Sequence, residues 1–250
     1  MRKTIILATA LLFAFSLQAA DLTVDEILAK NAEAKGGLEK LRALQSVRFT
    51  GKMAMGGMEA PFTMTKKRPE MMKVEFTVQG MTGSQAYDGS KGWMIMPFYG
   101  KKDPEEMSGD MLKEFKEEAD FDGPFVDYAK KGHKVELLGK ADVEGTPAYK
   151  LKLTKKEGSE STVYFDAETF LEVKVEAKRK IQGQDVDTET TYSNYQEIDG
   201  YLFPFALESK AKGAPAGQTF TLEKAEINPA VDEASFQMPA VAKAPETVKQ

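Results

Sequence analysis

The chain has 250 residues, no cysteine and a single histidine, and its 34 Lys and Arg residues are outnumbered by 39 Asp and Glu residues. The lack of cysteine excludes disulfides and a lipid anchor attached through a cysteine, so stability must come from an apolar core. The chain is long enough to form one large domain with such a core. The acidic balance argues against binding to nucleic acid and against tight electrostatic docking on anionic lipid.

Residues 1–20 have the composition of a secretory signal peptide. Arg2 and Lys3 precede an apolar run over residues 4–17, and two small residues ending at Ala20 offer a cleavage point. This run is shorter than the ~20 residues that span a bilayer. We therefore expect an exported chain, cleaved near Ala20. Loss of the leader removes two of the 34 basic residues and leaves 32 against 39 acidic ones, a net charge of −7.

The mature chain is predicted to open with a helix. Thr23 and Glu26 have the spacing of a capping box, and apolar residues follow at helical spacing. Gly36-Gly37 should break this helix before a second short apolar face around Leu41. From Val47 onward the apolar period changes from helical to two, which indicates β-strands.

Gly56-Gly57 predicts a tight two-residue turn between two strands. The register that this turn sets gives a hairpin with one apolar, methionine-rich face and one polar face, which contains Arg48. A slip of one residue would mix the two faces. The pairs expected on the apolar face are Phe49 with Met64, Gly51 with Phe62, Met53 with Ala60 and Met55 with Met58.

Strand-like segments continue along the rest of the chain, separated by turn signals. They cover residues 72–78, 81–87, 93–99, 135–138, 149–153, 162–165, 171–177, 188–198, 201–207 and 218–227. They predict an α+β protein that is mainly antiparallel β, with about ten to twelve short strands in one curved, incomplete barrel.

One segment, about 103–131, breaks this pattern. Asp103-Pro104 has the form of an N-cap followed by proline at the first helical position. Apolar side chains then fall on one helical face, which predicts an amphipathic insertion that covers the sheet as a lid. The residues of that face are Met107, Met111, Leu112 and Phe115. Residues 21–239 read as a single domain, and residues 240–250 have the composition of a disordered tail.

The sequence gives no positive sign of catalysis. His133 lies among lysines without a neighbour to orient it, and one histidine without cysteine makes a zinc site improbable. Nucleophile-elbow, phosphate-loop and dinucleotide motifs are absent. Carboxylates in the segment 103–127 could form an acid–base pair, but their spacing is that of a solvated helix face. We expect no enzyme, no cofactor and no metal.

Methionine is concentrated in one part of the chain, because nine of the thirteen lie between residues 53 and 96. Its flexible, polarizable side chain suits surfaces that adapt to varied partners. Two interpretations stay open: these residues fill an ordinary core, or they line a cavity for lipid. We favour the cavity. Its predicted lining is Phe49, Met53, Met55, Phe62, Met64, Met72, Val74, Phe76 and Trp93.

Short motifs are spread over nearly the whole mature chain. They are Gly36-Gly37 with Leu41, the segments 47–53 and 87–89, Trp93 with Pro97, and the segments 164–169, 195–204 and 231–239. Each is weak alone, but their order and spacing resemble the LolA-like superfamily of outer-membrane lipoprotein-sorting proteins. The resemblance implies an incomplete antiparallel barrel around a hydrophobic cavity, with helices as a lid.

The resemblance also implies a periplasmic carrier that shelters acyl chains of lipoproteins or other lipids during transfer towards the outer membrane. It implies donor and acceptor proteins at the membranes, and we expect a monomer. Carriers of this family hold the closed lid with an arginine. Arg48 lies on an early strand as that residue would, although the hairpin register puts it on the polar face. The alternative function is an envelope sensor or scaffold that binds a protein partner with the same fold.

Overall fold

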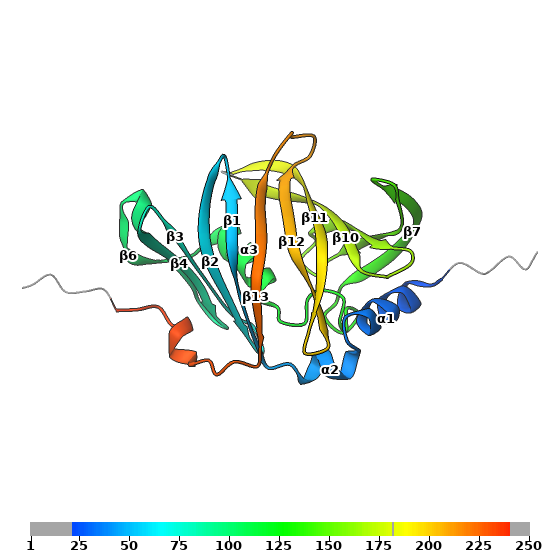
Figure 1. The fold of residues 1–250 in the computed structure, drawn as a ribbon, viewed down its shortest axis with the longest axis horizontal. Coiled ribbons are helices and arrows are strands. Elements are labelled where there is room, and N and C mark those ends of the chain that lie inside the picture. The colour runs from blue at the N-terminus through cyan, green and yellow to red at the C-terminus, as the bar shows by residue number, and fades with distance from the viewer. Residues whose placement is uncertain (1–21, 182, 241–250) are drawn as a thin grey trace, which may run out of the picture.

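The computed structural model describes residues 22–181 and 183–240. Thirteen antiparallel strands form one sheet in the order β6-β5-β4-β3-β2-β1-β13-β12-β11-β10-β9-β8-β7 (Figure 1). The sheet curves without closing, so β6 and β7 are its two edges. The predicted fold, a curved incomplete barrel that is mainly antiparallel, is confirmed. The predicted signal peptide and residues 241–250 of the predicted tail lie outside the described residues.

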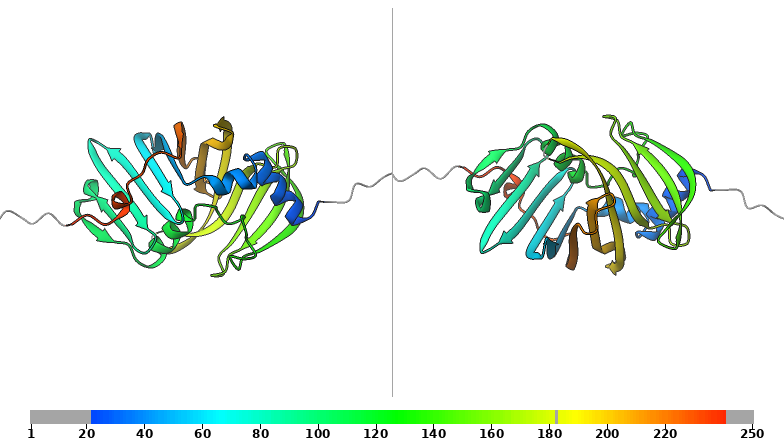
Figure 2. Two further views of the ribbon diagram at one scale, coloured as in Figure 1. Left: turned by 90° about the horizontal axis from the view of Figure 1, so that it is seen from below. Right: turned by 90° about the horizontal axis from the view of Figure 1, so that it is seen from above.

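The strands are β1 (Ser46–Met55), β2 (Met58–Lys67), β3 (Met71–Val78), β4 (Met81–Asp88), β5 (Gly92–Met96), β6 (Lys101–Glu106), β7 (Lys134–Val143), β8 (Thr146–Thr154), β9 (Glu160–Asp166), β10 (Glu172–Ile181), β11 (Gln184–Ile198), β12 (Tyr201–Ala211) and β13 (Gln218–Ile227). The helices are α1 (Val24–Ala34), α2 (Leu38–Ala43) and α3 (Gly109–Ala119), with short 3-10 helices η1 (Pro97–Tyr99) and η2 (Glu233–Phe236). Figure 2 shows α1, α2 and α3 against the hollow of the curved sheet.

The predicted start and break of the first helix are confirmed. The Thr23 side chain accepts a hydrogen bond from the Glu26 amide at 3.3 Å, and the Glu26 carboxylate accepts one from the Thr23 amide at 2.7 Å. The break needs glycine, because Gly36 has a φ of +116° and a Cβ there would lie 2.4 Å from the Gly200 carbonyl oxygen. This close approach fixes the two helices against the turn between β11 and β12.

The β1–β2 hairpin has the register that the sequence predicted. Phe49 pairs with Met64, Gly51 with Phe62, Met53 with Ala60 and Met55 with Met58. A glycine is required at position 51, because a Cβ there would lie 2.1 Å from the Thr221 carbonyl oxygen of β13. The hairpin is therefore joined tightly to the strand on its other side.

Two apolar clusters fill opposite halves of the hollow. Ile27 of α1 is fully buried and packs on Leu151 and Phe165 of β8 and β9. In the other half, Met72 and Tyr87 of the sheet pack against Phe115 of α3. Since α3 covers the methionine-rich strands, much of that face is ordinary core.

The predicted start of the helical insertion is wrong. Residues 101–106 form the edge strand β6, and α3 begins only at Gly109. An edge strand tolerates Pro104 because half of its backbone groups face away from the ladder. After α3, residues 121–132 form turns rather than a helix.

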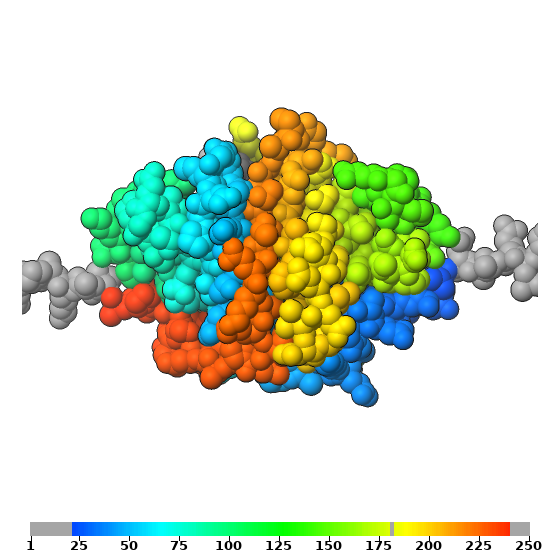
Figure 3. All heavy atoms as spheres, in the orientation of Figure 1, coloured from blue at the N-terminus to red at the C-terminus, as the bar shows by residue number. Residues whose placement is uncertain are grey.

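Trp93 packs on the face of the sheet opposite α3. Its neighbour Gly92 faces Met107 and Leu112 on the α3 side, and successive side chains of a strand point to opposite faces. The Trp93 indole nitrogen donates a hydrogen bond to the Phe236 carbonyl oxygen at 2.7 Å. The 3-10 helix η2 contacts β3 and β4, and Figure 3 shows this segment, in red, below the strands drawn in cyan. Trp93 thus anchors the C-terminal segment.

Candidate functional site

Two pockets lie between the sheet and the elements that cover it. We call the one beside α1 and α2, with a volume of ≈ 640 Å³, the helix pocket. The one between α3 and strands β9 to β11, with a volume of ≈ 850 Å³, is the charged pocket. Lys35, Phe125 and Pro204 contribute to both, so the two are neighbours. Both volumes fall within the range of small-molecule sites, roughly 300–1,000 Å³.

The helix pocket is walled mainly by apolar side chains. Leu28 of α1 and Leu41 of α2 line one side, and Phe125 of the segment after α3 lines another. The sheet contributes Phe49 of β1 and Phe203 of β12, whose rings meet edge to face with centroids 5.2 Å apart. Such a lining favours hydrocarbon over water.

Arg68 fixes the wall formed by residues 121–130. Its guanidinium donates two hydrogen bonds to the Asp122 carboxylate, both at 2.6 Å, and lies 4.6 Å from the centre of the Phe121 ring. It also donates to the carbonyl oxygens of Leu44 at 2.6 Å and Leu41 at 2.9 Å. One side chain therefore ties α2 to the opposite wall of the pocket.

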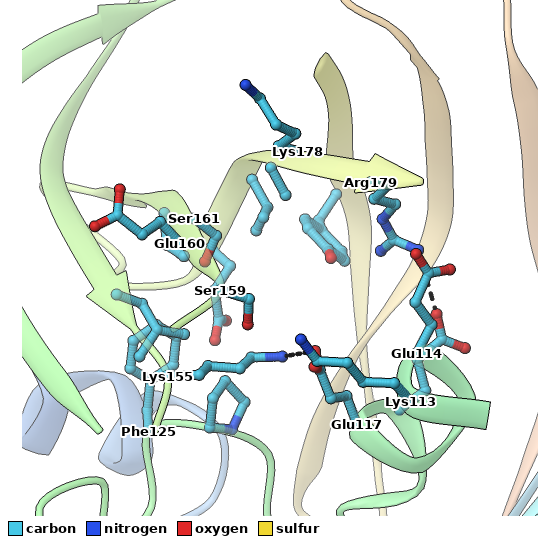
Figure 4. Close-up of a pocket in the computed structure, with 18 of the residues that line it drawn as sticks. Lys113, Glu114, Glu117, Phe125, Lys155, Ser159, Glu160, Ser161, Lys178 and Arg179 are labelled. Atoms are coloured by element: carbon cyan, nitrogen blue, oxygen red, sulfur yellow. Dashed lines mark hydrogen bonds and ion pairs between the residues drawn. The ribbon is translucent and has the colours of Figure 1, made fainter. Parts of the chain in front are cut away.

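Ion pairs link the two sides of the charged pocket. Lys155 points across it to Glu117 of α3 (Figure 4). Arg179 pairs with Glu118 at 3.5 Å, and Lys180 pairs with Asp110 at 3.5 Å. These contacts join α3 to the half of the sheet that its apolar face does not touch.

Two tyrosines lie in the charged pocket. The Tyr195 hydroxyl donates a hydrogen bond to the Glu172 carbonyl oxygen at 2.7 Å, and burial raises its pKa. Burial also raises the pKa of Tyr192 to about 12. Both side chains are therefore neutral at physiological pH, and neither has the activated hydroxyl of a nucleophile or base.

The structure brings one predicted lining residue, Phe49, to the helix pocket. Met64, Met72 and Val74 lie beneath α3 in the filled half of the hollow. Two further predicted residues on this face pack on other aromatic rings: Phe62 on Phe220, with ring centroids 5.6 Å apart, and Phe76 on Phe98, at 5.5 Å. Trp93 lies on the opposite face and is not a lining residue.

Met53 and Met55 lie towards the tip of the β1–β2 hairpin. The Met53 sulfur accepts a hydrogen bond from the Gln218 amide at 3.6 Å, and Met55 is 58% exposed. Met55 and its partner Met58, which is 59% exposed, reach solvent because the hairpin extends past the elements that cover the hollow.

Replacing both Met55 and Met58 with serine should leave the free energy of unfolding within ±0.5 kcal/mol of the parent, because exposed side chains lose little on truncation. Urea denaturation measures this difference. The matched control is Met72→Ser, at a methionine that is 1% exposed, which should lower the midpoint. Equal losses in the two variants would contradict the placement of the hairpin tip.

Arg48, the predicted lid-holding residue, does not line the helix pocket. Its neighbours Val47 and Phe49 face the helix pocket, so Arg48 points to the outer face. There it pairs with Glu226 at 3.3 Å and lies 3.4 Å from the Thr65 hydroxyl. The residue that holds the wall of the pocket is Arg68, in the turn between β2 and β3.

The predicted lid residues mostly face the core. Met107 is 2% exposed and precedes α3, while Leu112 and Phe115 pack on the methionine-rich half of the sheet. Met111 is 47% exposed. The charged side of α3, rather than its apolar side, lines a pocket.

No group of three or more His, Cys, Asp and Glu residues in the described parts of the chain could hold a metal ion. His133 has a local structural contact, since its Nδ1 accepts a hydrogen bond from the Lys156 amide at 3.1 Å. Within the same parts, no helix has both the length and the apolar character needed to cross a membrane.

Sequence reasoning missed most of the helix pocket. Its lining includes Leu28, Leu41 and Phe203, which the sequence pattern places only in helices or in a strand. The signal that could have found them is the break at Gly36-Gly37, which turns α1 and α2 so that they cover the sheet without filling it.

Solved structures that share this architecture include the following three. A DUF1329 family protein from Desulfovibrio piger matches with a TM-score of 0.61 and 15% identity over 86% of this chain and 97% of that one. A LolA superfamily protein from Nitrosomonas europaea matches with a TM-score of 0.56 and 15% identity over 87% and 98%. The chain has a LolA-like fold. A Vibrio parahaemolyticus domain named as an outer membrane lipoprotein-sorting protein matches with a TM-score of 0.53 and 12% identity, over 84% of this chain and 97% of that one.

The resemblance of the sequence motifs to the LolA-like superfamily is thus confirmed at the level of the fold. No protein-family model matches the chain, and no curated protein does.

Proposed function

We propose that the protein is an exported, periplasmic carrier without catalytic activity, which shelters the acyl chains of lipids or lipoproteins during transfer towards the outer membrane. The helix pocket carries this proposal. It offers ≈ 640 Å³ between α1, α2, the segment after α3 and the sheet, with an apolar lining. The LolA-like fold supports it, because one structure with this fold is named as a lipoprotein-sorting domain.

The free energy of burying hydrocarbon favours such a ligand. Each methylene group that leaves water contributes ~0.8 kcal/mol, so a sixteen-carbon chain gains on the order of 12 kcal/mol from full shelter.

The direct test is to purify the exported protein from the periplasm, extract it with organic solvent and identify any lipid by mass spectrometry. The expected result is a lipid with a long acyl chain, in near-stoichiometric amount. Protein that is fully folded but yields no lipid, and that binds none when lipid is added, would remove the carrier proposal.

Replacing Phe49 with aspartate should weaken the binding of an acyl chain at least tenfold, because a carboxylate in an apolar pocket loses its hydration. Displacement of a neutral fluorescent probe by dodecanol measures this affinity. The control is Thr50→Asp, which places the same charge on the neighbouring residue of β1, pointing to the outer face. If the two variants bound dodecanol with equal affinity, the acyl chain would bind outside the helix pocket.

The alternative, an envelope sensor or scaffold, is supported by a different feature. Met55, Met58 and Tyr99 are 58%, 59% and 77% exposed, and exposed apolar side chains favour contact with another protein. A partner that binds the lipid-free protein, and that the double serine variant at Met55 and Met58 fails to bind, would favour this function.

A further inference from the structure

Lys66 places an amine in the apolar helix pocket. It lies on β2 opposite Val47 of β1, and both side chains line the pocket. Long cationic side chains on a sheet normally reach solvent or a carboxylate. The partners of Lys66 therefore show whether the protein compensates its charge.

The Lys66 ammonium donates a hydrogen bond to the main-chain carbonyl oxygen of Asp120 at 3.2 Å. Within the described residues, no carboxylate forms an ion pair with it. The aspartates around the pocket are each engaged by another side chain. Asp120 pairs with Lys131 at 2.6 Å, Asp122 with Arg68 at 2.6 Å, Asp127 with Arg42 and Lys130 at 2.9 Å each, and Asp25 accepts a hydrogen bond from the Tyr128 hydroxyl at 2.8 Å.

The other two cations of the pocket lining differ from Lys66 in this respect. Lys35 pairs with Glu172, and Lys130 pairs with Asp127 at the exposed rim, where its side chain is 79% exposed. Burial lowers the pKa of Lys66 below its ordinary value, against the opposing effect of the nearby carboxylates of Asp120, Glu118 and Asp122. The charge of Lys66 is thus incompletely compensated by the protein itself, and an anion could complete it.

We propose that the helix pocket binds a single-chain amphiphile with an anionic head group, either a carboxylate or a phosphate monoester. The head-group oxygens accept hydrogen bonds from Lys66, and the hydrocarbon chain lies along Leu28, Leu41 and Phe203. This inference rests on the proposed acyl-binding function and restricts its ligand class to acidic amphiphiles.

The test compares dodecanoate, dodecyl phosphate and methyl dodecanoate as competitors of a neutral fluorescent probe bound to the full mature protein. Charge-assisted hydrogen bonds are worth ~1.5–3 kcal/mol, so the parent protein should prefer at least one of the two anions over the ester by tenfold or more. Lys66→Met should lose this preference while keeping its affinity for the ester. Lys66→Arg should retain it.

The matched control is Lys102→Met, which removes the same charge from an exposed position on the edge strand β6, outside both pockets, and should retain the preference. Thermal unfolding of each variant establishes that it is folded at the assay temperature. Inorganic phosphate alone distinguishes a free anion from an amphiphile and should not displace the probe.

Equal binding of the ester and both anions by the parent protein would overturn the head-group assignment and leave the acyl-binding function intact. A preference that persists in Lys66→Met would also overturn it. If none of the three amphiphiles bound, both the head-group assignment and the carrier function would be ruled out. Displacement of the probe by inorganic phosphate at the same concentration would show an anion site that needs no hydrocarbon chain, contrary to the proposal.

Discussion

Replacing Trp93 with alanine is expected to lower the free energy of unfolding by about 3–5 kcal/mol. Trp93 is 3% exposed, and its indole N–H donates a hydrogen bond to the carbonyl oxygen of Phe236, which is fully buried. The change leaves a cavity under the C-terminal segment and removes the hydrogen bond that holds it. Urea denaturation followed by far-ultraviolet circular dichroism measures the loss.

Trp93→Phe serves as the control, because it keeps much of the ring packing and removes only the hydrogen bond. It should cost about 1 kcal/mol. Since Trp93 is the only tryptophan of the chain, its fluorescence in the parent protein should shift to longer wavelength on unfolding. A loss below 1 kcal/mol for the alanine variant would contradict the burial of Trp93 between the sheet and η2.

Replacing Arg68 with methionine should lower the free energy of unfolding by about 2–3 kcal/mol and loosen the wall of the helix pocket. The guanidinium is 19% exposed and the Asp122 carboxylate 28% exposed, so removing Arg68 leaves a partly buried charge without its partner. Hydrogen exchange of the amides of residues 121–130, together with urea denaturation, measures both effects.

The same substitution at Arg48 provides the comparison. Arg48 pairs with Glu226 on the outer face at 33% and 32% exposure, where an ion pair contributes roughly 0–1 kcal/mol. Arg48→Met should therefore leave the exchange of residues 121–130 unchanged. If it accelerated that exchange as much as Arg68→Met, the assignment of the wall to Arg68 would be wrong.

Local signals in the sequence predicted the local structure well. The glycine pair at residues 56 and 57 set the hairpin register residue by residue, because a two-residue turn leaves one pairing that separates polar from apolar side chains. The capping box at Thr23 likewise predicted where α1 begins. In both places the determining residues lie within a few positions of each other.

The helix pocket could not be predicted in the same way. Its lining joins Leu28, Phe49, Phe125 and Phe203, which are far apart in the chain. Alternation along a strand shows which side chains share a face, but not which part of that face a helix will cover. Alternation alone therefore suits Met64 of β2 and Met72 of β3 to a cavity, whereas both lie in the apolar cluster that packs against α3.

Because the sheet is not closed, its two edge strands have unpaired backbone groups that could pair with another chain and begin aggregation. Both carry features that oppose this. Strand β6 consists of four charged residues around Asp103-Pro104, and proline offers no amide to a new neighbour. Strand β7 shifts its register between Leu137 and Gly139, and such an irregularity twists an edge away from further pairing. Both features oppose edge-to-edge pairing between two copies of the chain while the sheet stays unclosed.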